Sequence, residues 1–154
     1  QENLSTTDRP CVKPALERSE KIGAPATAIE LPDGRIITGK TGGLLGASAA
    51  ALVNTLKELA GIPHEKPILS PDALSPIQNL KTEYLGSKNP RLHTDEVLIA
   101  LSATAANNEE ATLALKQLSK LKGSQVHSSV MLSSVDEKLF KKLFCDITCE
   151  PKSI

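Results

Sequence analysis

The sequence predicts an α/β fold, a three-layer sandwich around a mixed sheet of about five strands. Two short strand-like segments, residues 26–31 and 35–38, flank Pro32-Asp33-Gly34, a turn sequence typical of β-hairpins. Beyond them, helical and strand-like segments alternate, which favours helices on both faces of one central sheet. Because the hairpin makes neighbouring strands antiparallel, the sheet is expected to be mixed rather than purely parallel.

The hairpin overlaps a phosphate-loop pattern. Residues 34–41 match G-x-x-x-x-G-K-[ST] at every fixed position. A phosphate loop must curl so that successive N–H groups converge on one phosphate. The run Ile36-Ile37-Thr38 is β-branched and prefers extended backbone. We therefore expect a strand here, and the alternative of nucleotide binding would require a wrapped loop.

Cap and turn residues place the later elements. Gly61 ends a helix over residues 44–60, whose first half is small or apolar on nearly every side and is therefore expected to pack closely against a sheet or a sister helix. Ser75-Pro76 predicts the start of a helix reaching about residue 85, and Thr94 caps another. The remaining predicted helices cover residues 109–121 and 135–143, and the remaining predicted strands cover residues 67–69, 125–132 and 146–149.

The length suits a single domain, predicted over residues 24–151 of the 154. Residues 1–23 are expected to be a linker or a partly ordered segment, with a short polar helix as the alternative. Val12, Leu16 and Ile22 are too sparse to define a buried face. Residues 152–154 are a tail. Because the first residue is Gln, the chain is expected to be a fragment or a processed product.

Charge and composition argue against two classes of partner. Eighteen basic and eighteen acidic residues cancel, so no overall field attracts nucleic acid or anionic lipid. With only Tyr84, Phe140 and Phe144 as aromatics, no stacking platform for single strands is expected. No apolar run approaches the roughly 18 residues that cross a bilayer. We predict neither nucleic acid nor membrane as a partner.

The three cysteines predict a reducing compartment. Their number is odd and no C-x-x-C occurs. Cys145 and Cys149 are expected to lie on one face of an extended segment about 13 Å apart, too far for a disulfide. Free thiols in the cytoplasm are therefore favoured over a redox or metal role.

The sequence lacks the residues that would bind a catalytic zinc ion. The hairpin and the long helix after it resemble the beginning of the cytidine deaminase fold, which places a His or Cys, a Glu and a later C-x-x-C at helix starts. Residues 42–47 and 75–78 contain none of these. His64 and His93, in polar loops, are interpreted as solvated. No metal, cofactor or catalytic residue is predicted for this chain alone, and neither ATP nor peptide hydrolysis is expected.

Two places remain as candidate ligand contacts. Free N–H groups around Gly39, Lys40 and Thr41, at a strand–helix junction, are expected to suit an anion. On the following helix, Asn54 is either a polar clamp on a loop or a ligand contact.

The second place is the strand end that carries His127 and Ser128, followed by Ser129. The alternative there is a half-exposed strand whose polar side chains meet water or the backbone. Since alternate strand residues face opposite sides, Ser128 is not expected to share a face with His127. The predicted ligand-binding set is therefore Gly39, Lys40, Thr41, Asn54, His127 and Ser128.

A run of ordered motifs resembles a known family. The motifs are Glu30-Leu-Pro-Asp-Gly-Arg-Ile-Ile-Thr-Gly-Lys40, Ala51-Leu-Val-Asn54, Leu59-Ala-Gly-Ile-Pro63, Pro76-Ile-Gln-Asn-Leu-Lys81, Leu85-Gly-Ser-Lys-Asn-Pro90, Glu96-Val-Leu-Ile-Ala-Leu-Ser102, Val126-His-Ser-Ser129 and Ile147-Thr-Cys-Glu-Pro151. In this order they resemble the C-terminal region of the domain-of-unknown-function family 1846, from about residue 24 to residue 151.

The resemblance implies a cytosolic bacterial protein without an established activity, and a fold similar to the cytidine deaminase topology without zinc. It also implies a larger N-terminal region in full-length members. Two functions are expected from the residues and the resemblance together. The first is a non-catalytic structural or oligomerisation domain that associates with itself or with that region. The alternative is a domain that completes a site for a nucleotide or another phosphorylated, anionic small molecule.

Overall fold

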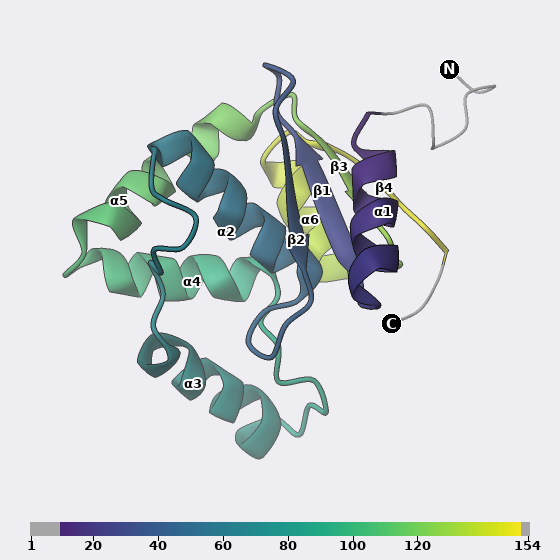
Figure 1. Ribbon diagram of the computed structural model, residues 1–154. Coiled ribbons are helices and arrows are strands. Elements are labelled where there is room, and N and C mark those ends of the chain that lie inside the picture. The colour runs from purple at the N-terminus through teal and green to yellow at the C-terminus, as the bar shows by residue number, and fades with distance from the viewer. Residues whose placement is uncertain (1–9, 152–154) are drawn as a thin grey trace.

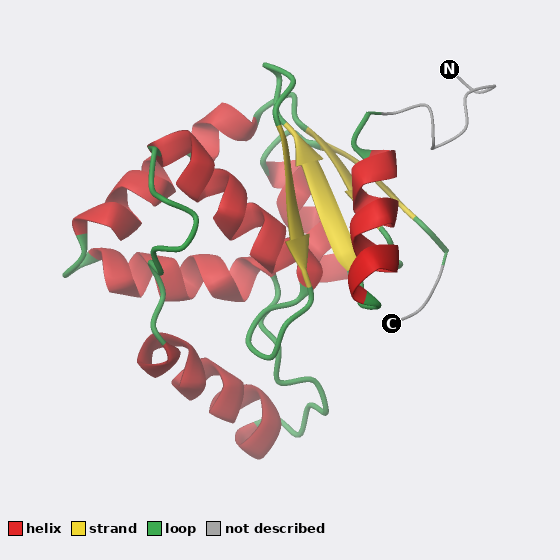
Figure 2. Ribbon diagram, in the orientation of Figure 1, coloured by secondary structure: helices red, strands yellow, loops and turns green. Residues whose placement is uncertain are grey.

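The computed structural model describes residues 10–151, so residues 1–9 and the predicted tail 152–154 lie outside the described part. Figures 1 and 2 show a sheet with helices on both faces and a further helical lobe. The elements are α1 (Val12–Ile22), β1 (Ala26–Glu30), β2 (Ile36–Lys40), α2 (Ala47–Ala60), α3 (Pro71–Asn79), the π-helical turn η2 (Leu80–Tyr84), α4 (Thr94–Ala105), α5 (Glu109–Lys116), the 3₁₀ turn η3 (Leu118–Leu121), β3 (Gln125–Ser128), α6 (Ser134–Lys142) and β4 (Asp146–Cys149).

The sheet is mixed, as predicted, and has the strand order β2-β1-β3-β4. Strand β1 is antiparallel to β2 and β3, and β3 is parallel to β4. Within residues 10–151 it has four strands rather than about five, because the predicted strand 67–69 is a loop. Pro67 has no N–H to donate to a sheet, and Ile68 is instead buried in the core through its side chain.

The hairpin prediction is confirmed. Ile29 pairs with Ile37 across β1 and β2. Gly34 adopts a φ of +94°, which glycine tolerates, and its N–H donates to the Leu31 carbonyl at 2.9 Å. The middle of the phosphate-loop pattern is thus a strand, and its backbone groups pair with β1 instead of converging on one point.

Helix α1 covers one face of the sheet, and α2 and α6 cover the other (Figure 1). On β1, Ala28 packs with Cys11 and Ala15, whereas Ile29 points into the main core. The expectation that the N-terminal segment lacks a buried face is therefore wrong. A narrow stripe of small residues is enough to form a buried face on α1, because Ala28 lets this helix approach the sheet closely.

Helix α2 begins at Ala47, later than the predicted residue 44, and ends at Gly61, whose φ is +74°. Its small residues serve the contact with the sheet of its own chain. A Cβ on Gly39 would lie 2.2 Å from the Ala51 backbone nitrogen, so β2 and α2 touch backbone to backbone.

Several other element boundaries differ from the prediction by a few residues. Ser70, not Ser75, caps α3, since the Ser70 hydroxyl accepts from the Ala73 N–H, and Pro76 lies inside the helix. His93 rather than Thr94 precedes α4. Strand β3 stops at Ser128, well before residue 132. The final strand, β4, has the predicted bounds.

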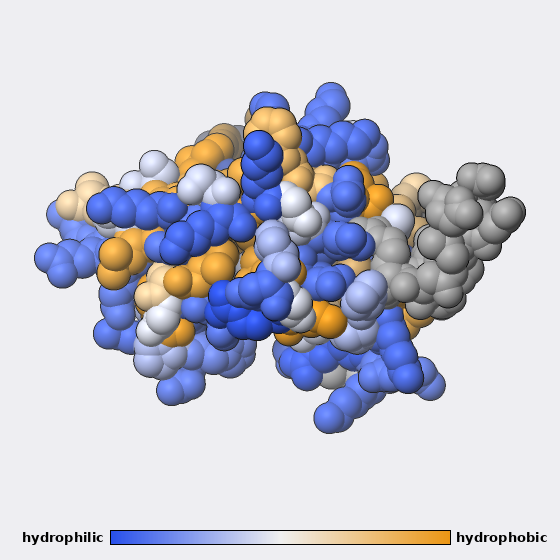
Figure 3. Space-filling view, turned by 90° about the horizontal axis from the view of Figure 1, so that it is seen from above, coloured by the Kyte–Doolittle hydropathy of each residue, from blue (hydrophilic) through white to orange (hydrophobic). Residues whose placement is uncertain are grey.

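The surface at the end of the sheet that carries the β1–β2 turn is mostly hydrophilic, with apolar patches between the hydrophilic residues (Figure 3). No helix in residues 10–151 is both long enough and apolar enough to cross a bilayer.

Candidate functional site

A cavity of about 350 Å³ lies where β3 ends and three helices begin. We call it the β3-end cleft. Its walls come from the first turns of α2 and α6, from the residues before α4 and from the loop that joins η2 to α4. The lining residues used below are Thr41, Gly46, Ala47, Ser48, Lys88, Arg91, His93, Ser128, Ser133 and Asp136. Ligands of α/β proteins commonly bind at such carboxyl ends of strands.

The start of α2 has no side-chain cap. Gly46 occupies the N-cap position with extended backbone, and among the described residues no side chain accepts from the first-turn N–H groups. These N–H groups carry the partial positive charge of the helix start. The neighbouring Ser48 hydroxyl lies 3.2 Å from the Thr27 hydroxyl and is buried. The geometry suits an anion beside Ala47 and Ser48.

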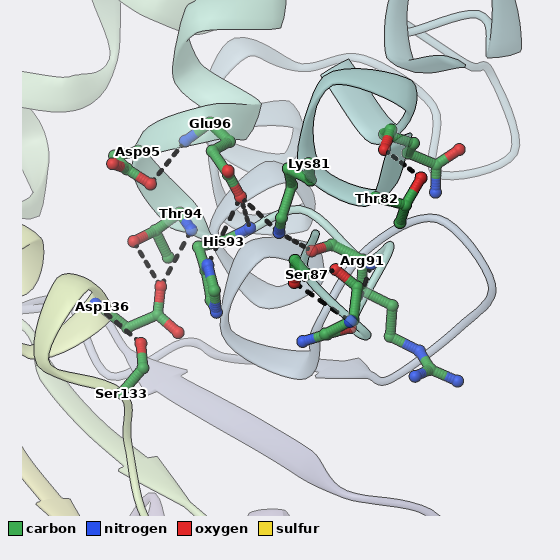
Figure 4. Close-up of polar contacts among 12 residues, drawn as sticks. Lys81, Thr82, Ser87, Arg91, His93, Thr94, Asp95, Glu96, Ser133 and Asp136 are labelled. Carbon is green, nitrogen blue, oxygen red and sulfur yellow. Dashed lines mark hydrogen bonds and ion pairs between the residues drawn. The ribbon is translucent and has the colours of Figure 1, made fainter. Parts of the chain in front are cut away.

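The starts of α4 and α6 are tied together by one carboxylate. Asp136 Oδ1 accepts from Thr94 N at 2.9 Å and from Thr94 Oγ1 at 2.7 Å. The Ser133 hydroxyl caps α6 by accepting from Asp136 N at 3.1 Å. Figure 4 shows these groups beside the His93 ring. The cleft wall is therefore fixed by hydrogen bonds between helices.

Glu96 orients the histidine of the cleft. Its Oε1 accepts from His93 N at 2.8 Å and from Lys81 Nζ at 2.9 Å, and lies 3.4 Å from His93 Nδ1. Burial opposes the charged form of Glu96, but the His93 N–H and Lys81 outweigh it and lower the pKa of the carboxyl. Lys81, from the π-helical turn, also donates to the Arg91 carbonyl. In Figure 4 the second ring nitrogen of His93 points away from Glu96.

Two cations border the cleft. Arg91 Nε donates to the Gly42 carbonyl at 2.5 Å. This bond joins the loop between η2 and α4 to the loop before α2. The Asn89 side chain accepts from Arg91 N at 3.1 Å. Lys88 is exposed at the rim of the cleft. Positive side chains and an uncapped helix start therefore border one cavity.

The structure separates the predicted ligand-binding residues into three places. Thr41 and Ser128 line the β3-end cleft. Gly39, Lys40 and Asn54 line a second cavity, at the free edge of β2. His127 lines neither cavity and is fully buried. The six residues do not form one site.

Asn54 acts as a polar clamp, but on strand β2 rather than on a loop as one of its two interpretations had it. Its Nδ2 donates to the Thr38 carbonyl at 3.0 Å. This bond joins α2 to β2 beside the close contact between Gly39 and Ala51. Asn54 still lines the second cavity, so the clamp also forms part of the cavity wall.

His127 lies on the opposite face of the sheet from Ser128, as the alternation of strand residues predicts. Its Nδ1 is 2.6 Å from Thr148 Oγ1 and its Nε2 is 2.9 Å from Glu150 Oε2. The expected half-exposed strand is instead buried, and these polar contacts satisfy the ring. Ser129 Oγ accepts from Ala26 N at 2.9 Å, so it too holds the sheet together.

Sequence reasoning missed the residues that give the cleft its character. His93 was interpreted as a solvated loop residue, and Asp136 and Arg91 were not singled out. The positions of the helix starts could have indicated these residues, because the first N–H groups of a helix have no partner within the helix. Their convergence depends on contacts between residues such as Thr94 and Asp136, which are 42 positions apart.

No cluster of three or more potential metal ligands occurs within residues 10–151. No cysteine forms a disulfide within residues 10–151, and Cys11 and Cys145 are buried. Burial raises the pKa of Cys145 to about 12, with a smaller contribution from Asp146. None of the three cysteines is among the residues that line the β3-end cleft.

Comparison with known proteins gives a consistent result. Residues 7–153 match the family described as domain of unknown function DUF1846, C-terminal. The chain is 58% identical over 148 residues to UPF0371 protein CE2832 of Corynebacterium efficiens, covering 96% of this chain and 30% of that protein. It is 57% identical to a UPF0371 protein of Corynebacterium glutamicum, over 94% of this chain and 29% of that protein.

A more distant relative is UPF0371 protein str1377 of Streptococcus thermophilus, 46% identical over 96% of this chain and 30% of that protein. The chain thus spans about 30% of the length of the relatives it matches. It belongs to the DUF1846 family and corresponds to the family's C-terminal domain.

Proposed function

We propose that this domain binds a phosphorylated small molecule in the β3-end cleft. The observation that carries the proposal is the start of α2, where Gly46 leaves the first turn without a side-chain cap beside Arg91. A phosphate accepts hydrogen bonds from several N–H groups at once and is favoured by the helix dipole.

The remaining contacts have complementary roles in this proposal. The Ser128 and Ser133 hydroxyls would orient the body of the ligand, and Lys88 would neutralise its second charge. The Asp136 carboxylate also lines the cleft and opposes an anion close to it, so the proposal places the phosphate at the start of α2 rather than at the start of α6. A cavity of about 350 Å³ fits a sugar phosphate more readily than a whole nucleotide.

Our proposal assigns binding rather than chemistry to this chain alone. We also propose that the topology is related to that of the cytidine deaminases without their zinc, and that the protein is cytoplasmic. Cys145 and Cys149, which form no disulfide among the described residues, support the location. Full-length relatives contain a further region, and in our proposal the bound ligand is shared with it.

A thermal-shift comparison tests the binding proposal. Ribose 5-phosphate at 100 times its Kd is expected to stabilise the domain by about 2.7 kcal/mol. Arg91→Met should weaken this stabilisation, whereas Lys120→Met, a change of the same charge far from the cleft lining, should not. An equal shift with ribose, or an equal response of both variants, would count against the proposal.

A second candidate function, self-association, is favoured by one surface. Helix α2, which first suggested it, is buried within its own chain. Tyr84 and Leu85, however, are 77% and 71% exposed at the end of η2, close to the exposed Leu80. If this surface pairs two copies, sedimentation velocity should show a dimer that Leu85→Ser disrupts. A monomer at all concentrations would exclude it.

A further inference from the structure

A second cavity, of about 550 Å³, lies at the free edge of β2. We call it the edge pocket. One wall is the last part of β2 and the facing side of α2, and the other is the loop between α2 and α3. Gly42 and Gly43, which follow Thr41 of the β3-end cleft along the chain, also line it. Within residues 10–151, the two cavities share no lining residue.

The deep part of the edge pocket is apolar. Leu45, Val53, Leu69 and Leu74 line it, from four different segments of the chain. Leu74 is almost fully buried, and Leu45 and Leu69 pack against it. Apolar walls with a few polar groups are typical of small-molecule sites.

The polar part is positive. Arg18, Lys40 and Lys57 line the pocket, and no Asp or Glu lines it among the described residues. Lys57 Nζ donates to the His64 carbonyl at 2.7 Å, and its side chain is almost fully buried. Desolvation lowers the pKa of Lys57, while Glu65 and Glu110, which lie outside the lining, oppose this change. A nearby anion would stabilise the charged form of a lysine that is desolvated in this way.

Arg18 supplies an independent sign of an incomplete site. Its Nε is closed off from solvent and has no hydrogen-bond partner among the described residues. A buried donor without a partner costs free energy that an acceptor would recover. Arg18 approaches from α1, on the opposite face of the sheet from Lys57, so the two cations bracket the strand edge.

The edge of β2 is not suited to a further strand. Leu31 N donates to Arg35 O, and Thr41 N donates to Pro25 O. Because hydrogen-bonded and non-hydrogen-bonded pairs alternate along an antiparallel ladder, the backbone N–H and C=O of Thr38 point away from β1. The Thr38 carbonyl is already bonded to Asn54 Nδ2. An added peptide strand would have to break this bond, and a small molecule would not.

We propose that the edge pocket is a binding site for a small amphipathic carboxylate, a molecule with an apolar body and one anionic head. The body packs against Val53, Leu69 and Leu74. The head is placed between Arg18 and Lys57. This site is separate from the β3-end cleft and does not depend on the function proposed for it.

Isothermal titration calorimetry with octanoate tests the site. Octanoate is expected to bind one per chain, and octan-1-ol, which lacks the charge, about tenfold more weakly. Arg18→Met should weaken octanoate about tenfold and leave octan-1-ol unchanged. Lys141→Met is the matched control, because Lys141 is exposed, pairs with Glu137 and lies outside the pocket lining.

A second variant distinguishes the loss of a specific contact from a loss of folding. Leu69→Asn should weaken both octanoate and octan-1-ol, since it alters the apolar wall rather than the charge. Inorganic phosphate, the probe for the β3-end cleft, should not compete with octanoate. Equal binding of octanoate and octan-1-ol, no effect of Arg18→Met, or the absence of octanoate binding to the folded protein would overturn the proposal.

Discussion

Asp136 and Thr94 join the first turns of α6 and α4 through two hydrogen bonds to one carboxylate oxygen, at 2.9 and 2.7 Å. Both residues are buried. Asp136 therefore caps a helix other than its own, since it accepts from the Thr94 backbone N–H. This contact fixes the distance between two of the three helix starts around the β3-end cleft.

Removal of the Asp136 carboxylate should destabilise the folded protein. Asp136→Ala leaves the Thr94 N–H and hydroxyl buried without their acceptor, and is expected to lower the free energy of unfolding by about 2–4 kcal/mol. Thr94→Val removes only the hydroxyl and should cost about 1 kcal/mol. Urea unfolding of both variants and the double variant measures their coupling. Fully additive effects would mean that the Thr94 hydroxyl and the Asp136 carboxylate do not stabilise each other.

A methyl group at Gly39 should disrupt the junction of β2 and α2. The added Cβ would lie 2.2 Å from the Ala51 nitrogen, and a backbone atom cannot move aside as a side chain can. Gly39→Ala is expected to destabilise the protein by about 3 kcal/mol or more, or to prevent folding. The control is Gly43→Ala, where no atom lies within 4 Å of the new Cβ. Thermal unfolding midpoints compare them, and similar midpoints would contradict the packing described here.

Local sequence was sufficient for much of the fold. The turn at Gly34 and the β-branched residues after it act within a few positions, so the hairpin could be predicted and the phosphate-loop pattern set aside. The bounds of β4 were predicted for the same reason. Ser70-Pro71 and Ser75-Pro76 offer the same helix-start signal, and local pattern did not decide between them.

The candidate site depends on contacts that no local pattern contains. Ser128 and Arg91 lie in separate segments, and only the sheet and the helix packing bring them to one cavity. The burial of His127 likewise depends on α1, which was expected to lack a buried face. Sequence identified polar residues near strand ends but not which face of the sheet each would occupy.

Thiol reactivity should follow burial. Cys149 is half-buried, whereas Cys145 is buried and has a pKa raised to about 12. Only the thiolate reacts, so at pH 8 about one Cys145 in 10⁴ would be reactive. Pulsed iodoacetamide labelling with peptide mass spectrometry should modify Cys149 first. Labelling of Cys145 as fast as Cys149 in folded protein would refute this order.

The raised pKa also has a consequence for alkaline stability. Since the unfolded Cys145 thiol ionises at lower pH than the folded one, the contribution is present below about pH 8.5 and is lost as the pH rises toward 12. Cys145→Ala should therefore flatten the loss of stability above pH 9, as urea unfolding at several pH values would reveal. A profile parallel to that of the unchanged protein would exclude this linkage.

Acid stability should depend on Glu96. The pKa of its carboxyl is lowered in the fold, so its contribution is present above its ordinary value of 4.5 and is lost as the pH falls below it. Glu96→Gln should reduce the slope of stability against pH in this range. Glu137→Gln, an exposed pair with Lys141, is the control and should leave the slope nearly unchanged. Identical slopes for all three proteins would show that Glu96 is not coupled to folding.

In our proposal, the start of α2 binds the phosphate of the ligand. The most direct measurement is a titration of the ¹⁵N-labelled domain with ribose 5-phosphate, following the amide resonances of Ala47, Ser48 and Ala49. Saturable shifts of these three amides are expected, weakened by Arg91→Met and preserved by Lys120→Met. Unshifted amides, or the same change with potassium chloride at equal ionic strength, would show that no phosphate binds there.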